Sequence, residues 1–213
     1  MYCYMQCSNM SPMADETGLR ERKKQRTRDA LIAAAVRLFE RNGYEQTTVA
    51  QIAAAADVTT RTFFLHFPAK EDVLFANAEV RVDIGLKAIA DRSPGESISD
   101  VLARSMADMM ANTFAGDLTT GLAALRARLV MSTPSLLARQ LHRLLAAQSE
   151  LAQALQRAYP DELDLLGAAA RVGAVTGAVS AAAATSLAQG DGPEQVQAAM
   201  SRALDIALHR ARS

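Results

Sequence analysis

The sequence contains few of the residues that most often carry out catalysis or bind metals. Only two cysteines and three histidines occur among its 213 residues: Cys3, Cys7, His66, His142 and His209. Neither His-Glu-x-x-His nor Gly-x-Ser-x-Gly is present, and the Gly-x-Gly at 190–192 lacks the third glycine of a dinucleotide-binding loop. A metal or redox role for the cysteine pair is the alternative interpretation, but no third or fourth ligand lies nearby. The sequence therefore predicts no enzyme, no metal site and no cofactor.

Excess positive charge is also lacking, because Lys plus Arg and Asp plus Glu number 23 each. The distribution is nevertheless uneven. Residues 19–28 hold six basic residues and one acid, a net charge of +5, whereas residues 76–213 hold 13 basic and 14 acidic residues. A basic segment of this kind, which includes Lys24 and Arg28, suits contacts with nucleic-acid phosphates because it displaces condensed counterions. A solvated run of surface charge is the alternative.

Long apolar runs are missing as well. Residues 1–17 have no run long enough for a signal peptide, which makes the cytoplasm the expected location, and residues 1–19 are expected to be a disordered tail. The Ala- and Gly-rich segment 167–188 is interrupted by Arg171, which leaves only 17 uncharged residues, 172–188. These are too few and too rich in alanine for a transmembrane helix, so no membrane contact is predicted.

Half of the residues are hydrophobic, and no run alternates in the manner of a β-strand. The pattern predicts an all-α protein of about nine helices. The first is expected at about 23–42 and a long helix at about 70–91. Five further helical segments are expected between breaks at 93–95, 115–117, 132–134, 159–160 and 190–193.

Residues 47–67 read as two short amphipathic helices joined by a turn, which is the form of a DNA-reading helix-turn-helix. The apolar residues of the first helix recur at i, i+3, i+4 and i+7: Val49, Ile52, Ala53 and Ala56. Thr47 or Thr48 can cap this helix, Asp57 tolerates a left-handed backbone in the turn, and Thr59 can cap the second helix. Phe63 and Phe67 should then point inward.

The run from 31 to 74 includes AAVRLFERNGY at 34–44 and TFFLHFPAKEDVL at 62–74, and it resembles the TetR family of transcriptional regulators. The remaining two-thirds resembles that family only in length and helical character. The resemblance implies a helix-turn-helix DNA-binding domain at 20–68 and a ligand-binding and dimerisation domain at 69–213.

Candidate DNA contacts combine the basic segment with the two short helices. Arg61 has a guanidinium fork that matches guanine O6 and N7, and Thr60 can meet a base edge or a thymine methyl, although a phosphate contact is the alternative for Arg61. Helix N-termini favour an anion at the capping threonines, and N-capping without a DNA contact is the alternative for Thr47 and Thr48. By resemblance Lys70 also reaches phosphate, whereas Phe64 stands where the family commonly has a tyrosine. The expected set is Lys24, Arg28, Thr47, Thr48, Thr59, Thr60, Arg61, Thr62, Phe64, Leu65, His66 and Lys70, with a packed structural histidine as the alternative for His66.

Residues 98–155 surround an effector pocket by the same resemblance. Flexible Met and Leu side chains there would suit a hydrophobic or amphipathic molecule of unknown identity, and ordinary core packing is the alternative for each of them. The expected lining is Met106, Met110, Phe114, Leu122 and Leu129, with Arg126, His142 and Tyr159 as polar groups.

In the family the last two long helices, here about 161–189 and 193–211, form a four-helix bundle with a partner subunit. A stripe of small residues is expected at this interface: Ala170, Gly173, Ala174, Gly177, Ala178 and Ala181. Burial of that stripe within one subunit is the alternative.

Taken together, these features predict a homodimeric regulator, with repression the expected mode, that a small effector releases from a palindromic double-stranded DNA operator. The alternative is a constitutive dimeric DNA-binding regulator whose C-terminal domain only dimerises.

Overall fold

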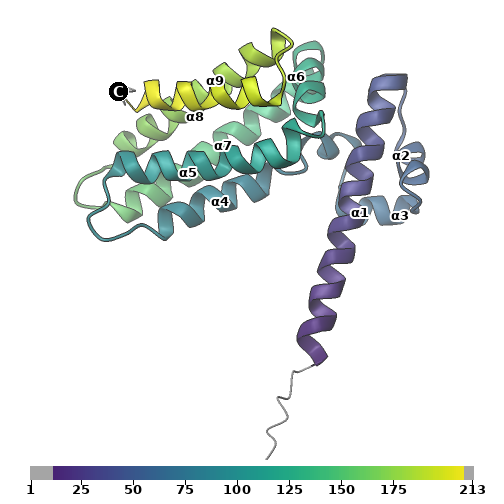
Figure 1. Ribbon diagram of the computed structural model, residues 1–213, viewed down its shortest axis with the longest axis horizontal. Helices are drawn as coiled ribbons and strands as arrows, with labels where there is room; N and C mark the ends of the chain where they lie inside the picture. Colours follow the sequence, from purple (N-terminus) through teal and green to yellow (C-terminus); the bar gives the residue numbers. More distant parts are fainter. Residues whose placement is uncertain (1–11, 209–213) are drawn as a thin grey trace, which may run out of the picture. The chain divides into compact units, whose positions relative to one another are not determined.

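The computed structural model describes residues 12–208, with side chains from Gly18 onward (Figure 1). Within this range the chain is all-α, as predicted, and contains no strand. The elements are α1 (Pro12–Asn42), α2 (Val49–Ala55), α3 (Thr60–His66), the 3-10 helix η1 (Lys70–Phe75), α4 (Ala78–Ala90), α5 (Ile98–Thr113), the π-helical segment η2 (Phe114–Leu118), α6 (Leu122–Ser132), α7 (Pro134–Ala158), α8 (Leu165–Ala188) and α9 (Pro193–Ala207). They divide into two compact units, Met1–Val73 and Leu74–Ser213.

The first helix begins earlier than predicted. It starts at Pro12 rather than near residue 23, so residues 12–19 of the expected disordered tail are helical. Proline is favoured at the first helical position, and extending an existing helix costs far less than nucleating one, so no apolar face is needed there. Residues 1–11, including Cys3 and Cys7, lie outside the described residues.

The N-terminal unit is a small helical core built on one face of α1. Leu31, Ala34 and Ala35 of that helix are fully buried, as their spacing predicted. Ile52 of α2 and Phe63 of α3 are also fully buried. Because both short helices pack on the apolar face of α1, this single cluster fixes the angle between α2 and α3.

The turn between α2 and α3 has the predicted chemistry. Thr48 caps α2 in a reciprocal capping box with Gln51, whose side chain accepts from the Thr48 backbone N–H at 2.9 Å. Asp57 has a φ of 55°, in the left-handed region expected for it. Thr59 caps α3 by accepting from the Thr62 N–H at 3.1 Å. Local sequence therefore specifies the start of both short helices.

The C-terminal unit is a helical bundle. In Figure 1 the helices α4, α5, α7, α8 and α9 run alongside one another, and α6 crosses them near one end. α8 packs against α7 and α9, and α4 packs against α5 and α7. Gly85 permits the close approach of α4, because a Cβ there would lie 2.7 Å from the Met109 sulfur and 3.0 Å from Leu151. The bundle encloses a core rich in Leu, Val and Met.

Two predicted boundaries of this unit differ from the structure. The helix expected at 70–91 is interrupted between η1 and α4, where the Asn77 side chain donates to Asp117 Oδ1 at 2.8 Å instead of continuing the helix. A break does separate α5 from α6 near the expected 115–117, but it lies at 119–121, because residues 114–118 form the π-helical segment η2. It carries Asp117 into the interior, where a widened helical turn presents its carboxylate to neighbouring helices.

Candidate functional site

The second short helix, α3, is held in place from its inner side. The rings of Phe63 and Phe67 are 0% and 1% exposed, with centroids 5.7 Å apart. The Arg28 guanidinium lies over the Phe67 ring, 4.5 Å from its centroid, and donates to the His66 carbonyl at 3.2 Å. Arg28, predicted to contact DNA, therefore also links α1 to the end of α3.

The opposite face of α3 is open to solvent. Thr60 and Arg61 are exposed, and the large apolar side chains of Phe64 and Leu65 are 55% and 74% exposed. An exposed guanidinium beside exposed apolar groups can read guanine edges and thymine methyls in a major groove. This face has the composition that a recognition helix requires.

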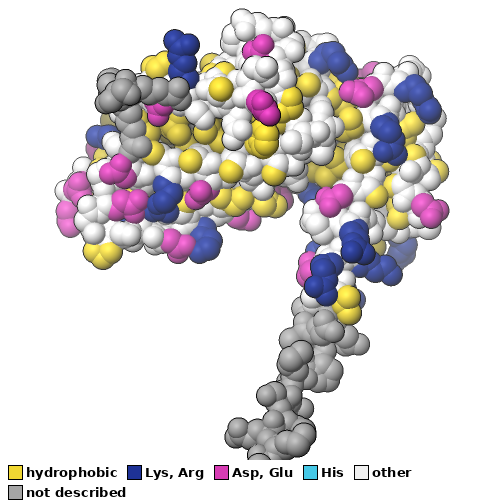
Figure 2. Space-filling view, in the orientation of Figure 1, with side chains coloured by type: hydrophobic (Ala, Val, Ile, Leu, Met, Phe, Trp, Pro, Cys, Tyr) yellow, Lys and Arg dark blue, Asp and Glu magenta, His cyan; other side chains and the backbone are white. Residues whose placement is uncertain are grey.

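The basic segment of α1 is likewise exposed. Its outer part carries several Lys and Arg side chains, including Lys24, and Figure 2 shows dark blue side chains gathered next to the grey end of the chain. They place positive charge on the same unit as the exposed face of α3. Such a basic segment favours contact with the phosphate backbone of a nucleic acid.

Two predicted contact residues have internal partners. Lys70 donates to the Tyr44 carbonyl at 2.8 Å, with its ammonium 4.2 Å from the Tyr44 ring centroid. His66 is half-buried, and burial, followed by the charges of Arg28 and Lys24, lowers its pKa. Both residues are therefore part of the domain's own structure, whatever else they contact.

Thr47 is a correction to the predicted set. It is 1% exposed, and its hydroxyl donates to the Gly43 carbonyl at 2.8 Å and to the Leu38 carbonyl at 3.2 Å. Its backbone N–H donates to the Tyr44 carbonyl. Thr47 therefore ties α2 to α1 in the interior, and only Thr48 caps the helix at the surface.

The C-terminal unit contains a cavity of about 230 Å³ between its helices. Four methionines contribute to the lining, namely Met106, Met109, Met110 and Met200, together with polar groups at Arg81, Arg126, Arg143, Gln148 and Thr176. Of the predicted pocket residues, Met106, Met110 and Arg126 lie here. Phe114 and Leu122 belong to the packed interior, and Leu129 and Tyr159 are not among the lining residues.

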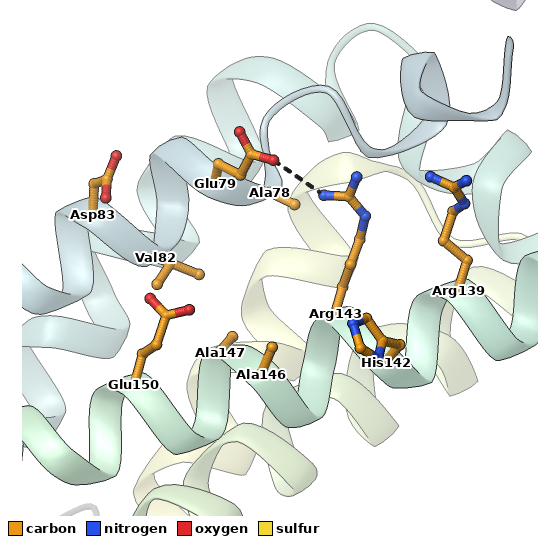
Figure 3. A pocket seen from close by; sticks show the side chains of 10 residues that line it. All are labelled: Ala78, Glu79, Val82, Asp83, Arg139, His142, Arg143, Ala146, Ala147 and Glu150. Atoms are coloured by element: carbon orange, nitrogen blue, oxygen red, sulfur yellow. Dashed lines mark ion pairs between the residues drawn. The ribbon is translucent and has the colours of Figure 1, made fainter. Parts of the chain in front are cut away.

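A groove of about 650 Å³ adjoins the cavity along the seam between α4 and α7. Groove and cavity share Ala78, Val82, Arg143 and Ala147. Figure 3 shows Glu79 of α4 turned toward Arg143 of α7, and their ion pair measures 3.5 Å. His142, a predicted pocket residue, lines this groove rather than the cavity. The groove and the cavity therefore lie next to each other at this seam.

A buried ion cluster forms part of the cavity wall. Asp117 is 0% exposed, and its Oδ2 accepts from Arg126 at 2.7 Å and from Arg81 at 2.9 Å. Arg126 also donates to the Leu74 carbonyl at 3.0 Å. Burial alone would raise the pKa of Asp117, but the charges of Arg126 and Arg81 outweigh it and lower the pKa. The carboxylate is thus ionised in the interior, where charged groups persist only when paired.

Residues 31–76 match the family model described as bacterial regulatory proteins, tetR family. The transcriptional regulator TcmR of Streptomyces glaucescens is 38% identical over 150 residues, which make up 69% of this chain and 66% of that protein. The chain belongs to the TetR family. It is therefore a helix-turn-helix transcriptional regulator, and this confirms the expectation that it is not an enzyme.

Solved structures agree on the fold of this TetR-family chain. FadR of Thermus thermophilus, solved with lauroyl-CoA, is 19% identical with a TM-score of 0.56, covering 87% of this chain and 95% of that one. The fatty acid degradation regulator FadR of Bacillus halodurans is 21% identical with a TM-score of 0.56, covering 87% and 96%. At these identities the similarity concerns the fold alone.

Most of the residues that line the cavity of this TetR-family chain were not predicted from the sequence, among them the polar residues Arg81, Arg143, Gln148 and Thr176. Arg81 and Arg143 look like surface arginines in the sequence, because their partners Asp117 and Phe75 come from distant segments. Thr176 carried a usable signal, since it is a polar residue in the middle of a largely apolar helix. It accepts from Gln148 Nε2 at 2.7 Å across the cavity wall. Tyr159, by contrast, donates to the Glu96 carbonyl at 2.8 Å and closes the bundle elsewhere.

The small-residue stripe of α8 faces outward in the single chain. Ala170, Ala174, Gly177 and Ala181 are exposed, and Gly173 and Ala178 are half-buried. A Cβ built at Gly173 or Gly177 would meet no atom within 4 Å. Among the described residues α8 is the one helix long and apolar enough to cross a membrane, and 28% of its apolar window is buried. Most of the apolar surface of α8 is therefore not buried in the single chain.

Proposed function

We propose that this TetR-family regulator is a homodimeric repressor that a small hydrophobic or amphipathic effector releases from a palindromic operator. Residues 20–68 would read DNA, and residues 69–213 would bind the effector and dimerise. The observation that carries the proposal is the methionine-lined cavity of about 230 Å³ in the unit that does not hold the helix-turn-helix. A cavity kept open in a bundle core forfeits packing energy, which a ligand can restore.

At the DNA end, α3 would enter the major groove with its exposed face. Arg61 is the proposed base reader, with Thr60, Phe64 and Leu65 beside it. Thr48, Thr59 and Thr62 lie at helix starts, where backbone N–H groups favour phosphate. Lys24 and Lys70 add positive charge for the backbone of the duplex, and Arg28 does so while holding the end of α3.

A second copy of the chain is the proposed cover for α8. Its exposed residues include the alanines and glycines of the stripe, which permit close helix approach, and the beginning of the helix adds exposed Leu165 and Leu166. On α9, Ile206 is 66% exposed. A two-fold axis through these helices would bury the same patch on both subunits and match the symmetry of a palindromic operator.

Release would follow from unequal ligand affinity of two conformations. An effector lowers operator affinity only if it binds better to the form whose two reading helices no longer fit successive major grooves about 34–36 Å apart. The cytoplasm is the proposed location, because the operator is there.

The alternative is a constitutive dimeric regulator whose C-terminal domain only dimerises. In that case the cavity is a packing defect, and no small molecule would change operator binding. The groove at the seam of α4 and α7 favours the ligand-responsive form, because it adjoins the cavity and would offer an effector a place to enter.

The test has two steps with the purified full chain. First, fragments of bacterial DNA that the protein retains are sequenced; a shared palindrome is expected, and retention without any shared sequence would contradict the DNA-reading role. Second, a library of amphipathic compounds is screened by thermal shift, and compounds that stabilise the protein are added to the operator complex. Release of the operator supports the proposal, whereas a library without a stabilising compound favours the constitutive alternative.

A further inference from the structure

The charges around the cavity are unequal. Arg81, Arg126 and Arg143 line it, and its lining includes no Asp or Glu. The nearest acids stand behind this surface: Asp117 pairs with two of the arginines, and Glu79 pairs with the third. The cavity surface itself therefore presents cationic groups and apolar side chains.

Asp117 cannot neutralise both of its partners. Arg81 and Arg126 converge on the same oxygen, Oδ2, while Oδ1 accepts from the Asn77 amide. The two guanidinium side chains are 14% and 16% exposed, so water does little to disperse the remaining charge. One carboxylate facing two partly buried guanidiniums leaves a net charge of about +1 at the cavity wall.

The two arginines also retain donor capacity. A guanidinium has five N–H donors in a planar fork. Within the described part of the chain, the contacts of Arg81 and Arg126 use Nη1 of each. A second anionic group could therefore accept hydrogen bonds from the remaining N–H donors of one or both arginines.

Arg143 is placed differently. Its partner Glu79 has a side chain that is 86% exposed, and its guanidinium lies 5.4 Å from the Phe75 ring centroid. It lines both the groove and the cavity. Arg143 therefore adds positive charge along the route inward, whereas Arg81 and Arg126 form the fixed site.

We infer that the effector is a hydrophobic anion whose acidic group binds Arg81 and Arg126 while its apolar body packs against Met106, Met109, Met110 and Met200. The inference rests on the proposed role of the cavity as the effector site and names the chemical class of that effector. A carboxylate and an ionised phenol share this chemistry. A neutral alcohol or a cation of the same size does not.

The same contacts suggest how the anion acts. Arg126 donates to the carbonyl of Leu74, which directly follows the last residue of the N-terminal unit, and to Asp117, which also holds Asn77. An anion that accepts from Arg126 competes with these acceptors. Binding would therefore alter the restraint on residues 74–77.

The experiment compares matched probes on the full chain by isothermal titration. Octanoate and naphthoate are the acids, octanol and naphthylmethanol their neutral counterparts, and octylamine the cationic one. Both acids are expected to bind at least about tenfold more tightly than their counterparts, since hydrogen bonds to charged groups are worth about 1.5–3 kcal/mol. Naphthoate against naphthol, titrated above the pKa of the phenol, separates a carboxylate from a phenolate site.

Variants locate the binding. Arg126→Met is expected to weaken octanoate binding about tenfold or more and to leave octanol unchanged, and Asp117→Asn is expected to tighten octanoate binding by removing its competitor. Arg128→Met, an exposed arginine of the same helix, is the matched control. Circular dichroism shows whether each variant is folded. The ratio of the dissociation constants for acid and alcohol, measured on the unsubstituted chain, tests the inference even if a variant fails to fold.

The outcomes separate the two ideas. Equal affinity for acids and alcohols, with operator release by both, overturns the anion inference and leaves the effector proposal standing. A preference for acids that Arg128→Met abolishes and Arg126→Met does not would move the site away from the cavity and also overturn it. Failure of every probe to bind overturns the inference, while the library screen above decides separately on the effector proposal.

Discussion

At the scale of single residues, α3 separates side chains that hold the helix from side chains that face outward. Arg61 belongs to the second group, because it is exposed while Phe63 and Phe67 fill the inner face. A bidentate arginine pair contributes about 1–3 kcal/mol of discrimination between bases. The Arg61 side chain should therefore affect base preference at the operator far more than it affects the stability of the fold.

Arg61→Ala is expected to relax base preference at one position of each half-site and to leave the thermal midpoint nearly unchanged. Binding to a set of single-base operator variants measures the preference. Lys24→Ala is the matched control, because an exposed lysine of α1 should lower affinity for all variants alike and reduce the salt dependence. If Arg61→Ala produced the same uniform loss, its contact would be with phosphate.

His66 gives a prediction for pH. Its pKa is lowered by burial and then by Arg28 and Lys24, so the folded chain binds fewer protons there than the unfolded chain below about pH 6.5. The contribution of His66 to the free energy of unfolding is therefore lost as the pH falls. A DNA phosphate placed beside these groups would raise the pKa again, so binding would take up a proton.

Operator affinity of the folded protein should accordingly rise as the pH falls from about 7.5 to about 6, by up to about tenfold per pKa unit regained. His66→Gln should flatten this dependence. Fluorescence anisotropy with a labelled operator measures it at constant ionic strength. An identical slope in the variant would show that His66 is only a packed structural residue.

At the scale of elements, the two adjacent threonines before α2 do different work. Thr47 bonds two carbonyls of the α1 end inside the core, and Thr48 caps α2 at the surface. Loss of buried hydrogen bonds costs about 1–3 kcal/mol, and loss of a cap costs about 1 kcal/mol. The two positions should therefore respond differently to the same kind of change.

Thr47→Val should lower the free energy of unfolding more than Thr48→Ala, with operator affinity per folded molecule unchanged by Thr47→Val. Urea unfolding and anisotropy on the same preparations measure the two quantities. Weakened operator binding by folded Thr47→Val would restore the DNA contact that the sequence predicted for this residue.

These threonines also show where sequence reasoning stops. The inner face of α3 was predictable, because the spacing of Phe63 and Phe67 is set by local helical periodicity. The choice between Thr47 and Thr48 was not, since either can cap a helix and only the contact with Leu38 decides. Arg81 escaped notice for the same reason, because its partner Asp117 lies 36 residues away. The start of α1 at Pro12 was not predictable from apolar periodicity, because residues 12–19 extend an existing helix without an apolar repeat of their own.

At the scale of the whole molecule, the outward face of α8 is an apolar surface that the single chain leaves uncovered. The helix is apolar enough to span a membrane by length and composition, yet only 28% of its apolar window is buried in one chain. Alanine and glycine give little lipid-facing bulk, and they permit two helices to pack closely. A second copy of the chain therefore suits this face better than a bilayer does.

Gly177→Leu tests that assignment with little risk to the subunit itself. A Cβ at Gly177 meets no atom within 4 Å in the single chain, and leucine is a better helix former than glycine, so the isolated subunit should accept it. Between two closely packed helices the same side chain would force the backbones apart, at a cost of about 1–3 kcal/mol for each copy. Size-exclusion chromatography with light scattering should then show a dimer dissociation constant raised by about tenfold or more. Ala107→Leu, an exposed alanine of α5, is the matched control and should remain dimeric. An unchanged dissociation constant for Gly177→Leu would place the dimer interface elsewhere. Recovery of the Gly177→Leu or Ala107→Leu protein in the membrane fraction would instead favour a bilayer as the environment of the outward face of α8.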